Sequence, residues 1–438
     1  MAHNEVAPKL DREFLQKLVD RPELFSKLQT LAFSDREYNP WRHVKYHTPE
    51  GIDPQDMWKA LLIARNGRPV ASLTDGSGHA FTLAHPESLK RRVDQVYRAL
   101  NYSTSTDSPF KGLDERHRRM YLQRSLAEEA ISSSQLEGAV TTREVAREMI
   151  LSKRTPEDAS ERMILNNYLT MERLREWKDQ PLSLKMLLEM HSQLTEGVLD
   201  DSKRGRFRRN EDHVVVYDAR RGEVVHLPPS ATDIETRLLR IVDFANADDD
   251  SGEYYYAIEK AAILHFMIGY EHPFCDGNGR TARALFYWYL LRKNWWLVEF
   301  LSISSLLKTP LWRKRYEEAY VDVETCGNDL TYFVLLQMDC LCEAARVFHD
   351  YIDRVQQEDH GLTEALKGVL NVRQLDLWRH AKRHPGYRYS AAEHSAWHKI
   401  SLNTARTDLE GLRKKGFLVL EMRGKTRTYH VKDGKYRK

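Results

Sequence analysis

Apolar residues along most of the chain recur at intervals of three or four, the spacing that places them on one face of an α-helix. The clearest example runs from Tyr254 to Glu271, and a second apolar helical face begins at Arg280 after a short loop. Alternation typical of β-strands is confined to three short stretches, each around a turn that contains glycine. The pattern therefore predicts a mainly α-helical protein with a few hairpins. The predicted hairpins are residues 69–83, 213–227 and 417–431.

The residues at the ends of the periodic segments favour helix boundaries. Thr142 and Ser401 are suited to cap helix N-termini, and Gly138 suits a helix C-terminus with a left-handed backbone. The helices predicted outside the central pair are Leu10–Leu31, Leu89–Leu100, Glu115–Glu137, Glu144–Leu151, Glu161–Trp177, Ser183–Leu199, Ala231–Phe244 and Thr331 to about Gln357.

Composition narrows the class of protein without indicating its function. The length of 438 residues suggests two or three domains, and 41% hydrophobic with 30% charged residues is typical of a soluble globular protein. The longest fully apolar run, Ala284–Leu291, is too short to cross a bilayer, and the first residues show no apolar signal region. The four cysteines show neither zinc-ligand spacing nor a disulfide framework. We therefore expect a cytoplasmic protein without a membrane segment.

The C-terminal part differs from the rest in charge. Residues 371–438 contain 17 Lys and Arg against 6 Asp and Glu, a net charge of +11, whereas the remainder has −8. Three helical segments followed by a hairpin predict a winged helix-turn-helix domain in residues 359–438. The positive charge favours DNA binding through 371–438; the alternative is a module for protein contacts or dimerisation. The recognition helix would begin with Asn403, Thr404, Arg406 and Thr407, and the wing would carry Arg423 and Lys425.

The chemically informative residues are concentrated between His272 and Arg283, which read His-Pro-Phe-Cys-Asp-Gly-Asn-Gly-Arg-Thr-Ala-Arg. Pro273 cannot continue the preceding helix, and the residue before a proline favours extended geometry, so we expect the chain to turn at His272. The glycines at 277 and 279 then form a loop that opens the next helix. The unpaired N–H groups and the positive dipole at such a helix N-terminus form an anion site.

Four polar side chains surround that predicted anion site. Arg280 and Arg283 share a helical face, so both can reach phosphate oxygens. Asp276 offers a hard oxygen ligand for Mg²⁺ shared with those phosphates. His272 is the group whose ordinary pKa suits general-base work near neutral pH. Together they predict a site for the phosphates of a nucleotide, beside a group that must lose a proton.

The stretch resembles the core motif of the Fic family, His-Pro-Phe-x-Asp/Glu-Gly-Asn-Gly/Lys-Arg-x-x-Arg, at every fixed position. Most characterised members of that family transfer AMP from ATP to a hydroxyl side chain of a target protein. The resemblance implies that His272 deprotonates the target hydroxyl, that Asp276 binds Mg²⁺ and that Phe274 anchors the loop. It also implies that the glycine loop and the two arginines bind the phosphates of ATP. The implied nucleotide-binding residues are Gly277, Asn278, Gly279, Arg280 and Arg283.

A second motif, Ser-Ser-Gln-Leu-Glu-Gly, runs from Ser133 to Gly138. Ser133 and Glu137 are four residues apart and project from the same helical face. A carboxylate at a helix C-terminus is mildly unfavourable there and gains from an arginine partner. The motif resembles the inhibitory signature of the Fic family, Ser/Thr-x-x-x-Glu-Gly/Asn. This implies an inhibitory helix near residues 115–138, in which Glu137 pairs with Arg283 and keeps the γ-phosphate of ATP out of place. The alternative is a solvated helix face.

The hairpin at residues 213–227 resembles the flap of the Fic family, which holds a target segment beside the active site by adding a strand. Edge pairing relies on main-chain hydrogen bonds, so it leaves the target protein unspecified; a plain structural hairpin is the alternative. A tyrosine located like Tyr316 contacts the nucleotide base in relatives, and a core aromatic is the alternative there. His191 lies on an apolar helix and is expected to be a packed core histidine.

The expected fold is mainly α, with a Fic-type helical bundle and a β-hairpin flap in residues 113–358. An accessory region of unknown task, residues 1–112, precedes it, and a small winged-helix domain follows. The expected function is that of a protein adenylyltransferase that uses ATP and Mg²⁺. A homodimer is expected because family members often self-associate. One alternative is a DNA-binding regulator whose Fic-like domain senses nucleotide, and another is a Fic enzyme that uses a different nucleotide donor or removes AMP.

Overall fold

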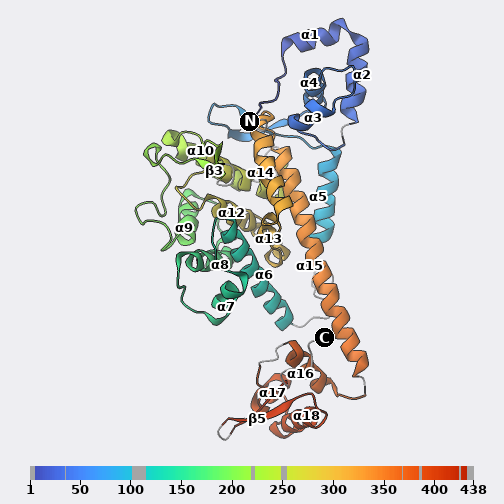
Figure 1. Ribbon diagram of the computed structural model, residues 1–438, viewed down its shortest axis with the longest axis vertical. Coiled ribbons are helices and arrows are strands. Elements are labelled where there is room, and N and C mark those ends of the chain that lie inside the picture. Colours follow the sequence, from blue (N-terminus) through green and yellow to red (C-terminus); the bar gives the residue numbers. More distant parts are fainter. Residues whose placement is uncertain are drawn as a thin grey trace. The chain divides into compact units, whose positions relative to one another are not determined.

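The computed structural model describes residues 5–34, 36–100, 115–218, 222–247, 254–366, 368–383, 387–423 and 426–431. Within these ranges helices predominate, and the strands pair into three antiparallel two-stranded sheets, which confirms the mainly α-helical prediction. Figure 1 follows the chain from its blue N-terminal helices to its red C-terminal ones. The chain divides into two compact units, residues 1–348 and 349–438, and the long helix α15 (Thr331–Ala365) contains the boundary.

The N-terminal region is helical on either side of a hairpin. The single helix predicted over Leu10–Leu31 is wrong, because the chain leaves helical geometry at Arg21 (φ −131°, ψ 76°). Pro22 explains the break, since it has no N–H to donate and its ring would clash with a carbonyl of the preceding turn. The predicted hairpin is present. The elements are α1 (Arg12–Asp20), α2 (Pro22–Phe33), α3 (Trp41–His47), α4 (Pro54–Arg65), β1 (Arg68–Thr74), β2 (Ala80–Leu83) and α5 (Glu87–Leu100).

Strand β2 attaches this region to the segment that precedes α15. The N–H of Thr82 donates to the carbonyl of Asn328, and its carbonyl accepts from the N–H of Leu330, both at 2.9 Å. Asp329 accepts a hydrogen bond from the hydroxyl of Tyr38 at 2.6 Å. The first hundred residues therefore belong to the same compact unit as the central helices.

The core of the first unit is the pair of helices α11 (Ala257–Glu271) and α12 (Asn278–Arg292), which pack against each other. Nearly all of their residues are buried, as expected for helices with apolar residues on every side. Helices α6 (Glu115–Leu136), α8 (Ala159–Trp177) and α9 (Leu184–Leu194) pack around α12 (Figure 1). The loop that joins α11 to α12 is thus held between the ends of two buried helices.

Other helix boundaries agree with those predicted from the sequence, or differ from them for local reasons. Thr142 accepts a hydrogen bond from the N–H of Val145 as an N-cap, and Gly138 has a positive φ of 99°, both as predicted. The helix predicted over Ser183–Leu199 ends early, at Leu194, because Thr195 leaves helical geometry. The remaining elements of this unit are α7 (Arg143–Ser152), β3 (Val216–Asp218), β4 (Glu223–His226), α10 (Ile234–Asn246), α13 (Ile303–Leu307), α14 (Pro310–Thr325) and short 3₁₀ segments.

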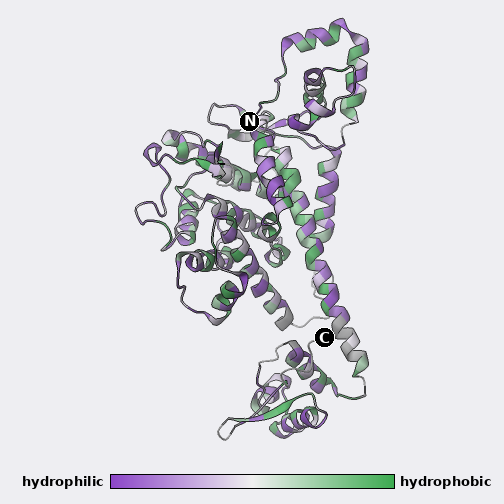
Figure 2. Cartoon of the chain, viewed as in Figure 1, coloured by the Kyte–Doolittle hydropathy of each residue, from purple (hydrophilic) through white to green (hydrophobic). Residues whose placement is uncertain are grey.

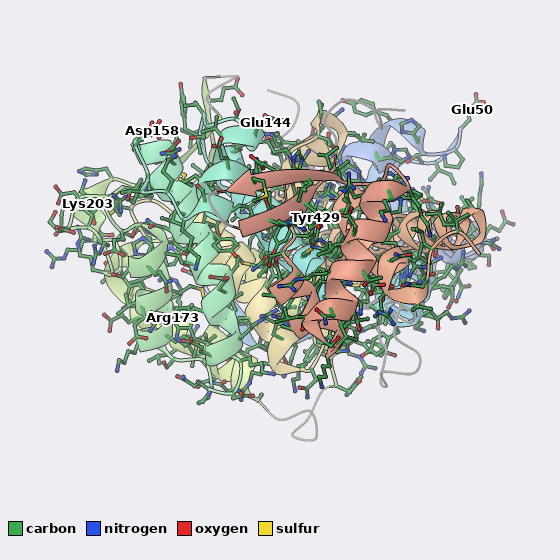
Figure 3. The ribbon with its side chains drawn as sticks, turned by 90° about the horizontal axis from the view of Figure 1, so that it is seen from below. Glu50, Glu144, Asp158, Arg173, Lys203 and Tyr429 are labelled. Atoms are coloured by element: carbon green, nitrogen blue, oxygen red, sulfur yellow. The ribbon has the colours of Figure 1, made fainter. Side chains whose placement is uncertain are left out.

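The second unit is small and has its own apolar core. Ser401 caps its last helix through a hydrogen bond from the N–H of Thr404, as predicted. Tyr389 and Tyr429 exchange two backbone hydrogen bonds, and Tyr429, labelled in Figure 3, is buried in the core. Two predicted wing features, Lys425 and the side chain of Arg423, lie outside the described residues. The elements are α16 (Val372–Arg383), α17 (Ala391–His398), α18 (Leu402–Lys414), β5 (Val419–Arg423) and β6 (Thr426–His430).

Hydrophilic and hydrophobic residues are interleaved along the helices of both units (Figure 2). Helix α5 is an example, with Leu89, Val93 and Val96 buried and Asp94 and Gln95 exposed. This arrangement is typical of helices that bury one side. In the part of the chain that the structure describes, no helix is both long enough and apolar enough to span a membrane.

Candidate active site

The loop between α11 and α12 is closed by the side chain of Asn278. Its Nδ2 donates to the carbonyl of Phe274 at 2.8 Å, and its Oδ1 accepts from the N–H of Phe274 at 2.9 Å. Phe274 is buried and stacks on His191, with ring centroids 3.8 Å apart. Both amide atoms of Asn278 are therefore engaged within the loop, and its backbone is the part left for a ligand.

His272 ends α11 in the left-handed conformation, with φ 46° and ψ 56°. The extended geometry predicted for it is therefore wrong. Its Nδ1 lies 3.1 Å from the carbonyl of Gly269, and because a carbonyl can only accept, Nδ1 carries the proton and Nε2 the lone pair. Burial lowers the pKa of His272 to about 4, and the hydrogen bond to Gly269 opposes this only in part. The imidazole is thus neutral near pH 7 and can accept a proton at Nε2.

Asp276 and Arg280 form an ion pair beside the loop. Arg280 donates through Nη2 to Asp276 Oδ2 at 3.1 Å and through Nη1 to the carbonyl of Leu194 at 3.2 Å. Arg280 is fully buried, and its Nε has no hydrogen-bond partner among the described residues. The side chain of Asp276, in contrast, is 48% exposed. Asp276 can therefore present a carboxylate oxygen to a metal ion while Arg280 balances part of its charge.

The N-terminus of α12 has no side-chain cap, and its glycines let a negatively charged group come close to the backbone. Gly277 precedes it with a positive φ of 81°, and a glycine has no side chain with which to cap the first N–H groups. A Cβ on Gly277 would lie 2.9 Å from the methyl group of Thr195, and one on Gly279 only 2.1 Å from Glu137 Oε1. Glycine at both positions allows close approach to the backbone. A helix N-terminus of this kind attracts anions.

The carboxylate of Glu137 lies at this N-terminus. Its Oε1 accepts a hydrogen bond from Arg283 Nη2 at 2.7 Å and lies against Gly279. Arg283 also donates through Nε to Ser133 Oγ at 2.8 Å and through Nη2 to the Ser133 carbonyl at 3.1 Å. Burial acts to raise the pKa of Glu137, but Arg283 and Arg280 outweigh it, so that pKa lies below its ordinary value. Glu137 is therefore an anion at neutral pH, paired with Arg283.

Helix α6 is fastened to the core by contacts that do not involve Glu137. The carboxylate of Glu129 accepts from Ser304 Oγ at 2.5 Å, from the N–H of Ser304 at 2.9 Å and from Ser302 Oγ at 2.9 Å. Further along the helix, Asn167 Nδ2 donates to Ser134 Oγ at 3.4 Å. These anchors precede Glu137 in the chain, so we expect α6 to stay docked when the Arg283 contact is broken.

Tyr316 lies near Arg283, on helix α14. Its hydroxyl is 3.0 Å from His265 Nε2 and 3.4 Å from the hydroxyl of Tyr320. Burial raises the pKa of Tyr316, and the positive charge of Arg283 opposes that shift. The hydroxyl is thus engaged with other protein groups, and its contact with a nucleotide base stays a prediction.

The predicted flap is the hairpin of β3 and β4, whose turn residues 219–221 lie outside the described residues. His226, the last residue of β4, donates through Nε2 to the carbonyl of Tyr270 at 2.7 Å. Its Nδ1 lies 2.9 Å from Glu324, and although burial acts to lower the pKa of His226, Glu324 raises it above its ordinary value. His226 therefore ties the hairpin to the C-terminal end of α11.

Two residues that contact the loop were not assigned a role from the sequence. His191 is buried as predicted, but it also donates through Nε2 to the carbonyl of Asp276 at 2.9 Å and accepts the N–H of Gly205 at Nδ1. Arg208 donates to the carbonyls that end α11. Nothing in the sequence distinguishes Arg208 from its neighbouring arginines, and the apolar helix around His191 gives only a core signal.

Comparison with known proteins bears on the same residues. Residues 181–290, which include the whole loop, match the Fic/DOC family. The chain is 32% identical over 114 residues to "Protein adenylyltransferase Fic" of Drosophila willistoni, covering 26% of this chain and 20% of that protein. It is 25% identical over 300 residues to the protein of that name from Culex quinquefasciatus, covering 67% and 54%. The chain thus spans about a fifth to a half of these curated relatives.

A solved structure shares the fold. The crystal structure of a Fic family protein from Desulfovibrio desulfuricans G20 matches with a TM-score of 0.53 at 18% sequence identity, covering 81% of this chain and 98% of that chain. The mainly helical arrangement around α11 and α12, with its small sheets, is therefore a Fic fold.

Proposed function

We propose that this chain, which carries a Fic/DOC family domain and is related to protein adenylyltransferases, transfers AMP from ATP to a Ser, Thr or Tyr hydroxyl of a protein. One observation carries the proposal: a neutral histidine lies at one end of the loop, and at the other end lies a helix N-terminus at which a carboxylate, that of Glu137, pairs with Arg283. A base and an anion site at the two ends of one short loop suit an attack by a hydroxyl on a bound phosphate.

In the proposed reaction His272 Nε2 takes the proton of the target hydroxyl as its oxygen attacks the α-phosphorus of ATP. A bond forms between that oxygen and the α-phosphorus, and the bond to the β-phosphate oxygen breaks, so that diphosphate leaves. The N–H groups at the start of α12 and the guanidinium of Arg283 stabilise the negative charge. His272 enters the reaction unprotonated because its buried ring is neutral.

The described residues fit Mg²⁺ bound together with a nucleotide. They contain no group of three or more His, Cys, Asp or Glu that could hold a metal ion by itself. Mg²⁺ is commonly bound by one or two carboxylates plus phosphates and water, and the half-exposed Asp276 can supply one carboxylate. Bound there, Mg²⁺ would neutralise phosphate charge and orient the diphosphate.

We propose further that Glu137 keeps the protein inactive. Its carboxylate makes the contacts that a phosphate would need: the first turn of α12 at Gly279 and the guanidinium of Arg283. Two anions cannot share one helix N-terminus and one arginine without strong repulsion. Release of Glu137 would therefore precede productive binding of the γ-phosphate.

The target protein would dock on the hairpin of β3 and β4. Tyr217 and Val224 of this hairpin are 57% and 51% exposed, and among the described residues no third strand pairs with this two-stranded sheet. An extended target segment could add a strand there.

Labelled ATP tests the proposed reaction directly. The protein with Glu137 replaced by glycine is incubated with Mg²⁺ and ATP labelled at either the α- or the γ-phosphorus, and label on protein is measured, self-modification included. AMP transfer moves only the α-label. Movement of the γ-label would indicate phosphoryl transfer instead, and movement of neither would contradict the proposal.

The pH dependence of the reaction should report the unusual pKa of His272. A base works when unprotonated, so activity is lost as the pH falls through the pKa, which burial lowers to about 4. We expect the Glu137→Gly variant to keep a nearly constant transfer rate between pH 8 and 5.5. A histidine of ordinary pKa would retain only about a tenth of its activity at pH 5.5. Half-maximal activity near pH 6.5 would contradict the assignment of His272 as the buried base.

A second candidate function is nucleic-acid binding by the second unit. On helix α18 the side chains of Asn403, Arg406 and Thr407 are exposed, while Ala405 and Leu409 are buried in the core. A helix with its N-terminal polar residues free to contact a groove, beside a hairpin, favours this function.

Salt dependence distinguishes DNA binding from protein contacts. If 371–438 neutralises phosphates, the affinity for duplex DNA in a shift assay should fall by about tenfold or more between 50 and 200 mM salt. Arg406→Ala should weaken binding, whereas Lys203→Ala, whose exposed side chain lies in the first unit (Figure 3), should not. No binding at low salt would leave the second unit as a protein-contact module.

A further inference from the structure

We propose that Arg208 is a positioning residue for His272: its guanidinium donates hydrogen bonds to the carbonyls at the end of α11 and so fixes the position of the imidazole. The inference rests on the transfer reaction proposed above, in which His272 is the base.

Arg208 makes more hydrogen bonds to the C-terminal end of α11 than its neighbouring arginines do. Its Nε donates to the carbonyl of His272 at 2.8 Å, and its Nη2 to the carbonyl of Glu271 at 3.1 Å. The same Nη2 donates to the carbonyl of Pro229 at 2.5 Å. The backbone N–H of Arg208 donates to the carbonyl of Pro273 at 2.8 Å. Three consecutive carbonyls, from 271 to 273, therefore bond to one residue.

The location explains why a cation suits this place. The last carbonyls of a helix have no partner within the helix, and they carry the negative end of its dipole. Arg208 is buried, with 6% of its surface exposed, so water does not compete for those carbonyls. The side chain of Glu271, which pairs with Arg237 at 2.9 Å, balances the buried positive charge.

The backbone of His272 needs this support. Its left-handed conformation is strained for a residue with a Cβ, and glycine is the usual residue at such a helix end. The proposed base must nevertheless be a histidine. The direction of a residue's carbonyl is set by its ψ, so the bond from Arg208 Nε to the His272 carbonyl fixes ψ at 56°. Fixing ψ and the hydrogen bond to Gly269 together fix the direction of Nε2.

Arg208 also joins His272 to the hairpin on which the target would dock. Pro229 follows the second strand of that hairpin, and its carbonyl shares Nη2 of Arg208 with the end of α11. A target strand held on the hairpin would thus keep a constant distance from the base. A planar guanidinium with donors in a fixed fork can bond all these carbonyls, whereas the single ammonium of lysine cannot.

The test exchanges Arg208 for lysine in the Glu137→Gly background. Misplacing a catalytic group by about 1 Å costs about a hundredfold in rate, so we expect Arg208→Lys to lower kcat by about ten- to a hundredfold. The dissociation constant of Mg·ATP, measured by calorimetry, should stay within twofold, because the described contacts of Arg208 do not include residues 276–283. Arg206→Lys is the matched control, since Arg206 bonds Asp212 in the same segment and should change kcat less than twofold.

A second readout does not depend on activity. Nitrogen NMR of labelled histidine, with His272→Ala to identify the signal, should show His272 as a single neutral tautomer protonated at Nδ1. Arg208→Lys should convert this signal to a mixture of tautomers. An unchanged His272 signal, or a kcat within twofold of the parent, would overturn the positioning role. A parallel loss of ATP affinity would also overturn it, because it would indicate general damage.

The two proposals fail in different ways. If the Glu137→Gly parent with Arg208 intact transfers no label, the proposed function is contradicted, and the NMR comparison still decides whether Arg208 positions His272.

Discussion

Replacing Glu137 by glycine is expected to raise the rate of AMP transfer about tenfold or more. The carboxylate of Glu137 pairs with Arg283 at 2.7 Å and lies against Gly279, and we propose that it thereby excludes a phosphate from the first turn of α12. An inhibited state that is populated ten times or more over the competent one lowers the apparent affinity and rate by that factor. Removing the carboxylate removes the competitor and leaves the anchors of α6 at Glu129 in place.

Thermal unfolding gives an independent check of the same variant. Loss of Glu137 leaves the buried Arg283 without its carboxylate, and breaking one side of a buried ion pair is strongly destabilising. The variant should therefore melt at a lower temperature than the parent without nucleotide. Because an anion can then take the vacated place, Mg·ATP should raise its melting temperature more than it raises that of the parent.

The matched control is Glu144→Gly, which removes an exposed carboxylate from the first turn of the next helix (Figure 3). It should leave both the transfer rate and the ATP-induced shift unchanged. Glu137→Gln, which keeps the shape without the charge, should activate less than glycine does. An unchanged rate in Glu137→Gly would discard the inhibitory role, even if the protein melts earlier.

The second large effect is expected from His272→Ala. A positioned general base contributes about 10²- to 10⁴-fold to a rate, and we expect the Glu137→Gly, His272→Ala double variant to lose transfer by that amount. Its affinity for Mg·ATP should remain within a few-fold, because the proposed anion site consists of α12 and Arg283 and does not include the imidazole. Label transfer and calorimetry on the same preparation separate the two properties.

A histidine elsewhere serves as the control for this variant. His79 is exposed, with 65% of its side chain accessible, and its ring lies beside Asp75 in the β1–β2 hairpin. His79→Ala should leave transfer unchanged. Retention of more than about a tenth of the parent rate in His272→Ala would show that another group removes the proton.

The sequence alone predicted the features that depend on neighbouring residues. The caps at Thr142 and Ser401 and the positive φ at Gly138 follow from local hydrogen bonding and sterics. The two central helices follow from long stretches in which apolar residues include those at helical spacing. The glycine loop could be located because glycine, asparagine and arginine at fixed spacing have few structural uses.

Tertiary contacts decided what local preference could not. A proline after His272 favours extended geometry, yet His272 is left-handed, and its carbonyl accepts a hydrogen bond from Arg208, 64 residues away in the chain. His191 gives only a core signal in the sequence, yet it bonds the carbonyl of Asp276. Burial by distant segments sets the pKa of His272 at about 4. The amino-acid sequence supplies the chemical groups, but their conformation and protonation depend on residues that only the folded structure brings close.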